Sequence, residues 1–368
     1  MSRFPDPIAK ALGAARTDEL EELRQDVGEL GKRIVDVYTT DVLLIPLNPE
    51  KVPEWKRIAR QEGETWVFVG STDGVPVLAL DEPSETGMRD HAAAVIYPEL
   101  HMRLVSWWLV HAWRAVDLLE DTLDNLHRWR VTSGAVTARA LVEEAGALAE
   151  EAKKIAASWS TAKNEQANVI GRPAAVREAL APILLQAGMG SRLKGSAASL
   201  QATNVLTLVQ KLSRETGDVR FIKWYDWLSD SAHPAFGARI AFSTPPLLHE
   251  SKATMLRYYS RSPMSLDSES DSEPLEPTIA FYIADALMAS GKVILETLDQ
   301  ILVVIDDFGL TTAAATLTRR SYWRNFQPTR GSRMCPCGRG KWSQCRHHWG
   351  EPAPELRLPK TGRDGRSE

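Results

Sequence analysis

The chain has 368 residues, 43% of them hydrophobic and 25% charged, and a formal net charge of −4. This composition is typical of a globular protein and excludes a fibrous, collagen-like or mainly disordered chain. No apolar run approaches the ~18 residues that span a bilayer, and the first residues, MSRFPDPIAK, lack the apolar region of a signal peptide. We therefore expect a cytoplasmic protein without a membrane partner.

The first predicted helix covers residues 17–38. Its apolar side chains recur at alternating steps of three and four, and Thr17, Asp18 and Glu19 suit a helix start. The apolar positions are Leu20, Leu23, Val27, Leu30, Ile34 and Val37. This register lasts for about two and a half heptads, which is short for a coiled coil. Packing against the rest of the chain is therefore favoured, and dimerisation is the alternative.

Residues 65–80 predict a β-hairpin. Two β-rich runs, WVFVG and VPVLAL, are separated by the turn sequence Ser71-Thr72-Asp73-Gly74. Pro76 cannot donate a backbone hydrogen bond, which suggests an exposed edge strand. Because a two-stranded hairpin is marginal alone, we expect it to lean on a helical body. The helix and the hairpin form a predicted N-terminal region over residues 1–88.

Residues 89–318 predict an α-helical domain. Between Glu99 and Arg130 one apolar stripe indicates a long packed helix. The stripe consists of Val105, Trp108, Leu109, Ala112, Val116, Leu119, Leu123 and Leu126. Further helices are expected at 134–158, 173–187, 198–214, 218–231 and 277–308. Successive helices with few strands favour a mainly α fold, a helical bundle.

Three further patterns lie within this domain. Residues 260–277 hold six Ser and five Asp or Glu, which predicts a disordered loop. A charged stripe on the long helix is expected to face solvent or a partner; it comprises His111, Arg114, Asp117, Asp121 and Asp124. Tryptophans at helical spacing are expected in the core. They are Trp107, Trp108, Trp113, Trp224 and Trp227.

A polar constellation is predicted inside the bundle. Tyr225, Ser229 and His233 stand at i, i+4 and i+8 before a proline, so they share one face of a helix that ends there. Arg139 and Glu143 are likewise one helical turn apart. These five side chains are therefore the candidates for chemistry in the helical domain.

The constellation loosely resembles a family of uncharacterised helical bacterial proteins with a Tyr, Ser and His-Pro signature. The resemblance implies that His233 acts as an acid or base beside Ser229, with Arg139 and Glu143 nearby. The alternative is that His233 caps helix carbonyls or satisfies a buried polar network. The Arg and His pair of the helical ribonucleases called HEPN, four to six residues apart, is not intact in this sequence.

All three cysteines of the protein fall in the segment CPCGRGKWSQCRHH, at Cys335, Cys337 and Cys345, followed by His347 and His348. In a reducing compartment this grouping does not indicate a disulfide framework. Three thiolates and one imidazole are the donors of a closed tetrahedral zinc site. The segment therefore predicts bound Zn²⁺, with His347 preferred as the fourth ligand and His348 as the alternative.

The segment resembles the SEC-C motif, a small zinc-binding element appended to many bacterial proteins. The match lies in the CPCGxGK core, although the third cysteine comes one residue earlier and Arg346 separates it from His347. The resemblance implies a bacterial protein with a C-terminal zinc knuckle over residues 330–350 that docks on protein or ribosomal partners. Residues 351–368 are expected to form a flexible tail.

Charge is distributed unevenly along the chain. Residues 319–368 hold 12 Lys or Arg and 4 Asp or Glu, a balance of +8 that leaves −12 for residues 1–318. A basic tail can bind nucleic acid, ribosome or an acidic protein surface, or remain solvated without a partner. We expect a binding protein whose knuckle docks the helical domain onto a protein, ribosomal or nucleic-acid partner. The alternative is a helical nuclease-like effector enzyme, of the stress or phage-defence type, that uses His233.

Overall fold

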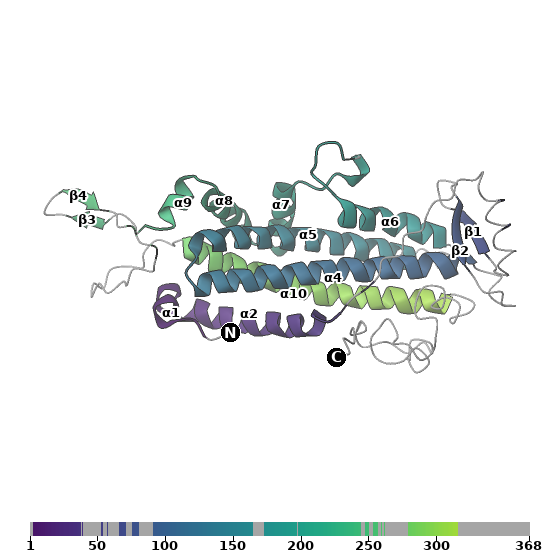
Figure 1. The fold of residues 1–368 in the computed structure, drawn as a ribbon, viewed down its shortest axis with the longest axis horizontal. Helices are drawn as coiled ribbons and strands as arrows, with labels where there is room; N and C mark the ends of the chain where they lie inside the picture. Colours follow the sequence, from purple (N-terminus) through teal and green to yellow (C-terminus); the bar gives the residue numbers. More distant parts are fainter. Residues whose placement is uncertain are drawn as a thin grey trace, which may run out of the picture. The chain divides into compact units, whose positions relative to one another are not determined.

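The computed structural model describes most of the helical part of the chain (Figure 1). The described residues are 3–37, 39, 53, 57, 66–70, 76–80, 91–164, 173–196, 198–243, 247–249, 253–256, 259, 261 and 279–315. They are mainly helical, which confirms the predicted fold class at this level. The predicted zinc knuckle, the tail and, apart from Arg261, the loop at 260–277 lie outside the described residues.

The elements follow one another as helices interrupted by two short strand pairs. The helices are α1 (Asp6–Leu12), α2 (Ala14–Ile34), α4 (His91–His127), α5 (Val131–Asn164), α6 (Pro173–Met189), α7 (Val205–Thr216), α8 (Arg220–Ala232), α9 (Phe236–Ile240) and α10 (Ile279–Ala315), with a 3-10 helix at Ala198–Leu200. The strands are β1 (Trp66–Gly70), β2 (Pro76–Leu80), β3 (Leu247–His249) and β4 (Thr254–Leu256).

Both strand pairs are antiparallel. β1 pairs with β2 from Trp66 opposite Leu80 to Gly70 opposite Pro76. The turn residues between these strands lie outside the described part of the chain, so the complete hairpin stays a prediction. β3 pairs with β4 over three residues each, a pairing that the sequence analysis did not predict.

Several helix bounds differ from the prediction. The helix expected at 17–38 is α2, Ala14–Ile34, so Val37 lies beyond its end. The helix expected at 198–214 is divided, and α7 begins only after Asn204, whose side chain accepts a hydrogen bond from the amide of Leu206 at 3.0 Å. The short helix α1 was not predicted at all. Pro7 lies in its first turn, where the fixed φ of proline favours a helix and its missing N–H is not needed.

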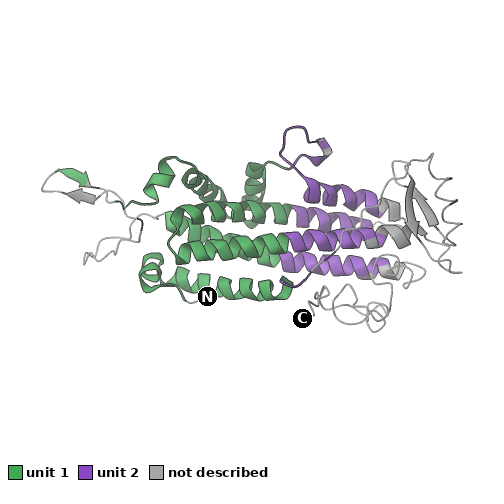
Figure 2. Ribbon diagram, viewed as in Figure 1, with its two compact units in different colours: residues 1–34, 111–150, 203–297 green, residues 35–110, 151–202, 298–368 purple. Residues whose placement is uncertain are grey.

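The described chain forms two compact units (Figure 2). Unit 1 is drawn from residues 1–34, 111–150 and 203–297, and unit 2 from residues 35–110, 151–202 and 298–368. The helices α4, α5 and α10 each contribute residues to both units. Each unit has its own core.

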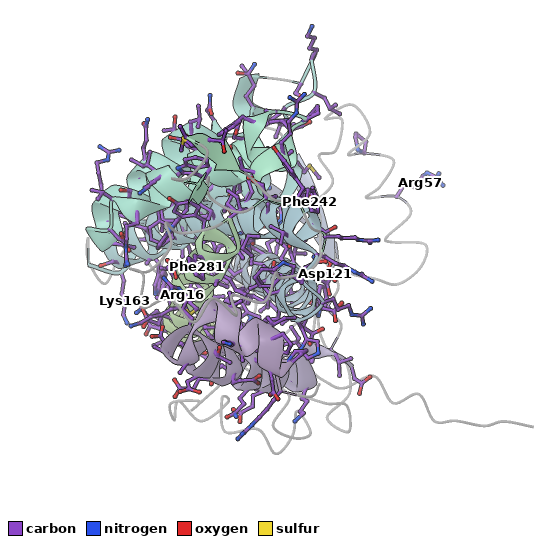
Figure 3. All side chains as sticks on the ribbon, turned by 90° about the vertical axis from the view of Figure 1, so that its left-hand side faces the viewer. Arg16, Arg57, Asp121, Lys163, Phe242 and Phe281 are labelled. Carbon is purple, nitrogen blue, oxygen red and sulfur yellow. The ribbon has the colours of Figure 1, made fainter. Side chains whose placement is uncertain are left out.

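The core of unit 1 contains the apolar stripe of α2. Its predicted members from Leu20 to Ile34 are all buried, as expected for packing within the chain. α10 comes so close that a Cβ on Gly291 would lie 2.8 Å from Leu23 Cδ1 on α2 and 3.1 Å from Leu119 Cδ2 on α4. At its edge, Arg16 Nε donates to Asp285 Oδ1 at 2.7 Å. The guanidinium of Arg16 also lies 4.6 Å from the centre of the Phe281 ring (Figure 3).

The core of unit 2 is built around Phe308 on α10. Its ring makes edge contacts with Trp159 on α5 and Tyr97 on α4, at centroid distances of 4.9 and 6.3 Å. Trp108 on α4 donates from its indole nitrogen to the backbone carbonyl of Leu298 on α10 at 2.9 Å. Trp108 is buried, as are Trp107 and, in unit 1, Trp224, in line with the predicted core role of these tryptophans.

The predicted stripe of the long helix α4 is confirmed in both units, because all eight of its members are buried. Among the described residues, none of the helices has the length and apolar character needed to cross a bilayer.

Replacing Gly291 by Val should destabilise unit 1, because the added side chain has no space between Leu23 and Leu119. We expect the free energy of unfolding to fall by about 1–3 kcal/mol. Urea denaturation of the full chain measures this change. Gly28 on α2 is the matched control, since a Cβ there meets nothing within 4 Å. The Gly28→Ala variant should gain up to about 1 kcal/mol from helix propensity, and an equal loss in both variants would contradict the close packing at Gly291.

Candidate functional site

The structure brings Arg139, Glu143 and Tyr225 together in unit 1. Arg139 and Glu143 lie one turn apart on α5, and Arg139 Nε donates to Glu143 Oε1 at 3.1 Å. Tyr225 on α8 donates its hydroxyl to the same carboxylate oxygen at 3.2 Å and accepts from Arg139 Nη2 at 3.3 Å. The guanidinium also lies 5.3 Å from the centre of the Tyr225 ring. The cluster therefore joins α5 to α8 through a closed set of polar contacts.

Ser229 and His233 are not part of this closed set. His233 is the exposed residue that ends α8, with extended backbone angles (φ −95°, ψ 157°) as expected before a proline. Its amide donates to the carbonyl of Ser229 at 3.2 Å. The hydroxyl oxygen of Ser229 is buried without a hydrogen-bond partner in the described part of the chain, and the imidazole of His233 does not reach it.

This geometry limits what the constellation can do chemically. Oε1 of Glu143 is engaged by two donors, Arg139 and Tyr225, which hold the carboxylate in place. His233 is accessible to a substrate, but within the described residues no side chain orients its ring. A general acid or base must lie within hydrogen-bond distance of the group to or from which it transfers a proton. Here only a bound substrate could supply that group.

A second polar cluster, which the sequence analysis missed, lies where α4 meets α5 in unit 1. Glu144 on α5 is buried, and its Oε1 lies 2.5 Å from His111 Nδ1. Its other oxygen accepts from Arg114 Nε at 2.7 Å. Burial raises the pKa of the Glu144 carboxyl, but the hydrogen bonds and charges of His111 and Arg114 outweigh this effect and bring the pKa below its ordinary value.

This cluster corrects the interpretation of the charged stripe on α4. Asp117 and Asp121 are exposed, as predicted. His111, however, is largely covered, with 12% of its side chain exposed, because its ring turns toward Glu144. The stripe is therefore solvent-facing only in part.

Unit 2 holds further paired carboxylates. Asp307 on α10 accepts from the indole nitrogen of Trp159 and from Lys163 Nζ on α5, each at 2.7 Å. Burial raises the pKa of Asp307, but these two donors outweigh it and the pKa lies below its ordinary value. Glu99 is fully buried, with Arg103 Nη2 2.7 Å and Arg177 Nε 3.8 Å from its carboxylate oxygens. Such contacts attach helices to one another, and the carboxylates that form them are occupied by protein donors.

The predicted zinc ligands Cys335, Cys337, Cys345 and His347, together with His348, lie outside the described residues. In the part of the chain that is described, no group of three or more His, Cys, Asp or Glu side chains is placed to hold a metal ion. The donor types themselves fit Zn²⁺, because three thiolates and an imidazole satisfy its tetrahedral coordination. The zinc site stays a prediction.

Comparisons with protein-family models, with curated proteins and with solved structures found no match to this chain.

Replacing Glu144 by Gln should lower stability at neutral pH, because His111 and Arg114 lose the carboxylate that pairs with them. We expect a loss of about 3 kcal/mol in the free energy of unfolding at pH 7. The folded pKa lies below the ordinary value of 4.5, so the stabilisation is complete above that pH and is lost as the pH falls through the folded pKa. The difference between variant and parent should therefore shrink in acid.

Urea denaturation at several pH values measures this dependence. Asp121, exposed on the same helix α4, provides the matched control. The Asp121→Asn variant should stay within about 0.5 kcal/mol of the parent at every pH. A Glu144→Gln variant whose deficit is the same at pH 7 and in acid would contradict the role assigned to the ionised carboxylate.

Proposed function

We propose that this chain is a bacterial cytoplasmic zinc-binding protein whose C-terminal knuckle docks the helical domain onto a partner. The observation that carries the proposal is the placement of all three cysteines within residues 335–345, followed by His347, in the CPCGxGK spacing of the SEC-C motif. Cysteine is otherwise missing from the sequence, so its use here is selective.

The ligands would be Cys335, Cys337, Cys345 and His347. They fill the four positions of a tetrahedral site, which leaves no place for an activated water, so the ion would organise the segment rather than catalyse a reaction. Arg339 and Lys341 would offset the negative charge of three thiolates. Because so short a segment has almost no apolar core, its folding would depend on the ion.

The partner would present an acidic surface. The segment from residue 319 onward carries a balance of +8, whereas residues 1–318 carry −12. A protein, a ribosome or a nucleic acid with exposed negative charge would attract the basic segment and leave the acidic body outside the contact. Trp342 and Trp349 would add apolar anchors, which interfaces often contain.

The first test is the zinc content of the purified full chain, measured by plasma emission spectrometry. We expect about one zinc per chain, as for other closed structural sites. The Cys337→Ser variant should lose most of it. His347→Gln and His348→Gln form a matched pair: only the first should lower zinc affinity, by at least about tenfold. A parent protein with far less than one equivalent of zinc, prepared without chelator, would exclude the proposal.

A second candidate function is a helical nuclease-like effector that uses His233. The observation in its favour is the exposure of His233 at the end of α8, the helix that Tyr225 joins to Arg139 and Glu143. An exposed imidazole is available as a general acid or base for a phosphodiester substrate. Ser229, whose hydroxyl is buried without a hydrogen-bond partner among the described residues, is not placed to assist it.

Cleavage of a labelled RNA by the full chain tests this second function. The His233→Ala variant should cleave at least about a hundredfold more slowly, because general acid–base groups contribute on that scale. Asp226→Ala is the matched control, since Asp226 is exposed on the same helix and should leave the rate unchanged. Absence of cleavage by the parent, or equal rates in parent and His233→Ala, would exclude His233 as the catalytic group.

A further inference from the structure

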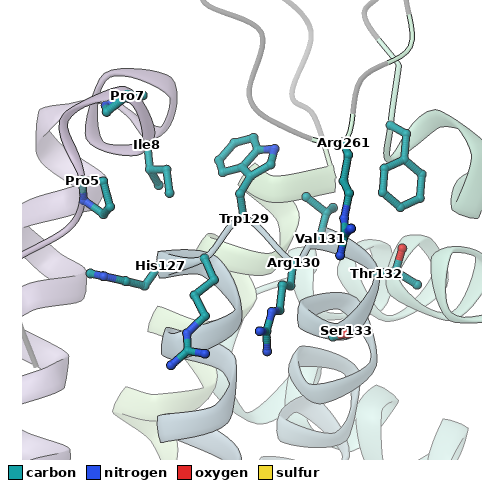
Figure 4. Close-up of a pocket in the computed structure, with 12 residues that line it drawn as sticks. Pro5, Pro7, Ile8, His127, Trp129, Arg130, Val131, Thr132, Ser133 and Arg261 are labelled. Atoms are coloured by element: carbon teal, nitrogen blue, oxygen red, sulfur yellow. The ribbon is translucent and has the colours of Figure 1, made fainter.

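A pocket of about 840 Å³ opens where α4 ends and α5 begins, within unit 1 (Figure 4). Its wall combines the short connection between these helices with α1 and with two residues that follow α9, Phe242 and Arg261. This volume lies within the roughly 300–1,000 Å³ that small-molecule sites occupy. It is large enough for a ligand of several rings or groups.

The pocket is strongly basic. Arg128, Arg130, Arg261 and His127 line it, and no Asp or Glu is among the described residues that do so. Arg128 is paired with Asp124 on α4, with Nε 2.9 Å from Oδ1. Arg130 and Arg261 are exposed and form no ion pair with any residue that the structure describes. Two guanidinium groups are therefore available to an anion.

Backbone groups add to this positive charge. α5 begins at Val131, and the residues of its first turn, Val131, Thr132 and Ser133, line the pocket. Their amides have no backbone acceptor among the described residues. A helix N-terminus carries about half a positive charge. Placing Arg130 directly before it is unfavourable unless an anion compensates, because a cation there opposes the helix dipole. The local electrostatics thus favour a ligand with concentrated negative charge.

One side chain indicates the rest of the ligand. Trp129 has a positive φ of 51°, a strained conformation for a bulky residue, and its indole stands between Ile8 and Arg261 (Figure 4). A planar ring of a ligand can stack on this indole.

We propose that this pocket binds a nucleotide, with its phosphate at Arg130, Arg261 and the first turn of α5, and its base against Trp129. Arginine forks suit phosphate because they donate two parallel hydrogen bonds to its oxygens. This proposal is independent of zinc and of His233, so it stands or falls separately from the proposed function.

Isothermal titration calorimetry of the full chain with AMP, adenosine and inorganic phosphate tests nucleotide binding by the pocket. AMP should bind one per chain, and adenosine and phosphate should each bind at least about tenfold more weakly, since each lacks one half of the recognised group. The Arg130→Gln and Arg261→Gln variants should each weaken AMP binding by at least about fivefold. Both side chains are exposed, so their loss should leave the thermal midpoint unchanged.

The Trp129→Gly variant separates the contribution of the base to AMP affinity from that of the phosphate. Glycine adopts the positive φ of this position without strain, so the variant should fold, bind AMP about tenfold more weakly and bind phosphate as the parent does. Arg33 is the matched control, because it is exposed on α2 outside the pocket. Arg33→Gln should bind AMP like the parent.

Three results would overturn the proposal. The first is absence of AMP binding by the parent at about 1 mM. The second is an equal loss of affinity in Arg33→Gln and Arg130→Gln, which would reflect general attraction of anions. The third is tight binding of a single-stranded oligonucleotide by a chain that does not bind AMP, which would assign the surface to nucleic acid instead.

Discussion

A carboxylate can lie between packed helices only where cations or hydrogen-bond donors reach it, and this requirement shapes the polar contacts of both units. In unit 1, Glu144 is buried on α5 and is approached from α4 by His111 and Arg114. In unit 2, Glu99 is buried on α4 and is approached from α6 by Arg177. Sliding either helix pair by one turn, about 5.4 Å, would break every one of these contacts. The apolar stripes drive the helices together, and the paired carboxylates fix their register.

The connection between α4 and α5 shows the opposite situation, with charge that the protein does not neutralise. α4 ends at His127, and the chain reverses over three residues before α5 begins at Val131. Arg128 follows the negative C-terminal end of α4 and pairs with Asp124, so it is electrostatically satisfied. Arg130, two residues later, precedes the positive end of α5 and has no such carboxylate among the described residues. The carboxylates described between helices are paired, whereas Arg130 has no carboxylate partner in the described part of the chain and lies next to the strained Trp129. A binding site at this connection is the simplest explanation.

Periodicity in the sequence predicted the helices that bury a continuous stripe of apolar side chains. It did not predict contacts between residues that are far apart in the sequence. The stripes of α2 and α4 follow from spacing alone, because each places one apolar side chain per turn on the same face. Glu144 could not be found in this way, since it lies 33 residues from His111 and its partner depends on how α5 packs against α4. Asn204 is a typical N-cap residue, so the sequence does indicate that α7 begins directly after it. For the candidate site, spacing predicted the pair Arg139 and Glu143 and the helix face of Tyr225, but not that His233 would stand apart from them.

Charge also separates the two anion-binding functions proposed for this chain. Residues 1–318 carry −12, so the long-range field of the body repels anions, and the pocket must act through contacts within a few ångströms. The segment from residue 319, with a balance of +8, can attract an acidic partner from farther away. Salt screens interactions beyond about 8–10 Å much more than those in a partly enclosed pocket. Docking through the C-terminal segment should therefore weaken steeply with ionic strength, whereas a nucleotide held by Arg130 and Arg261 should be affected far less.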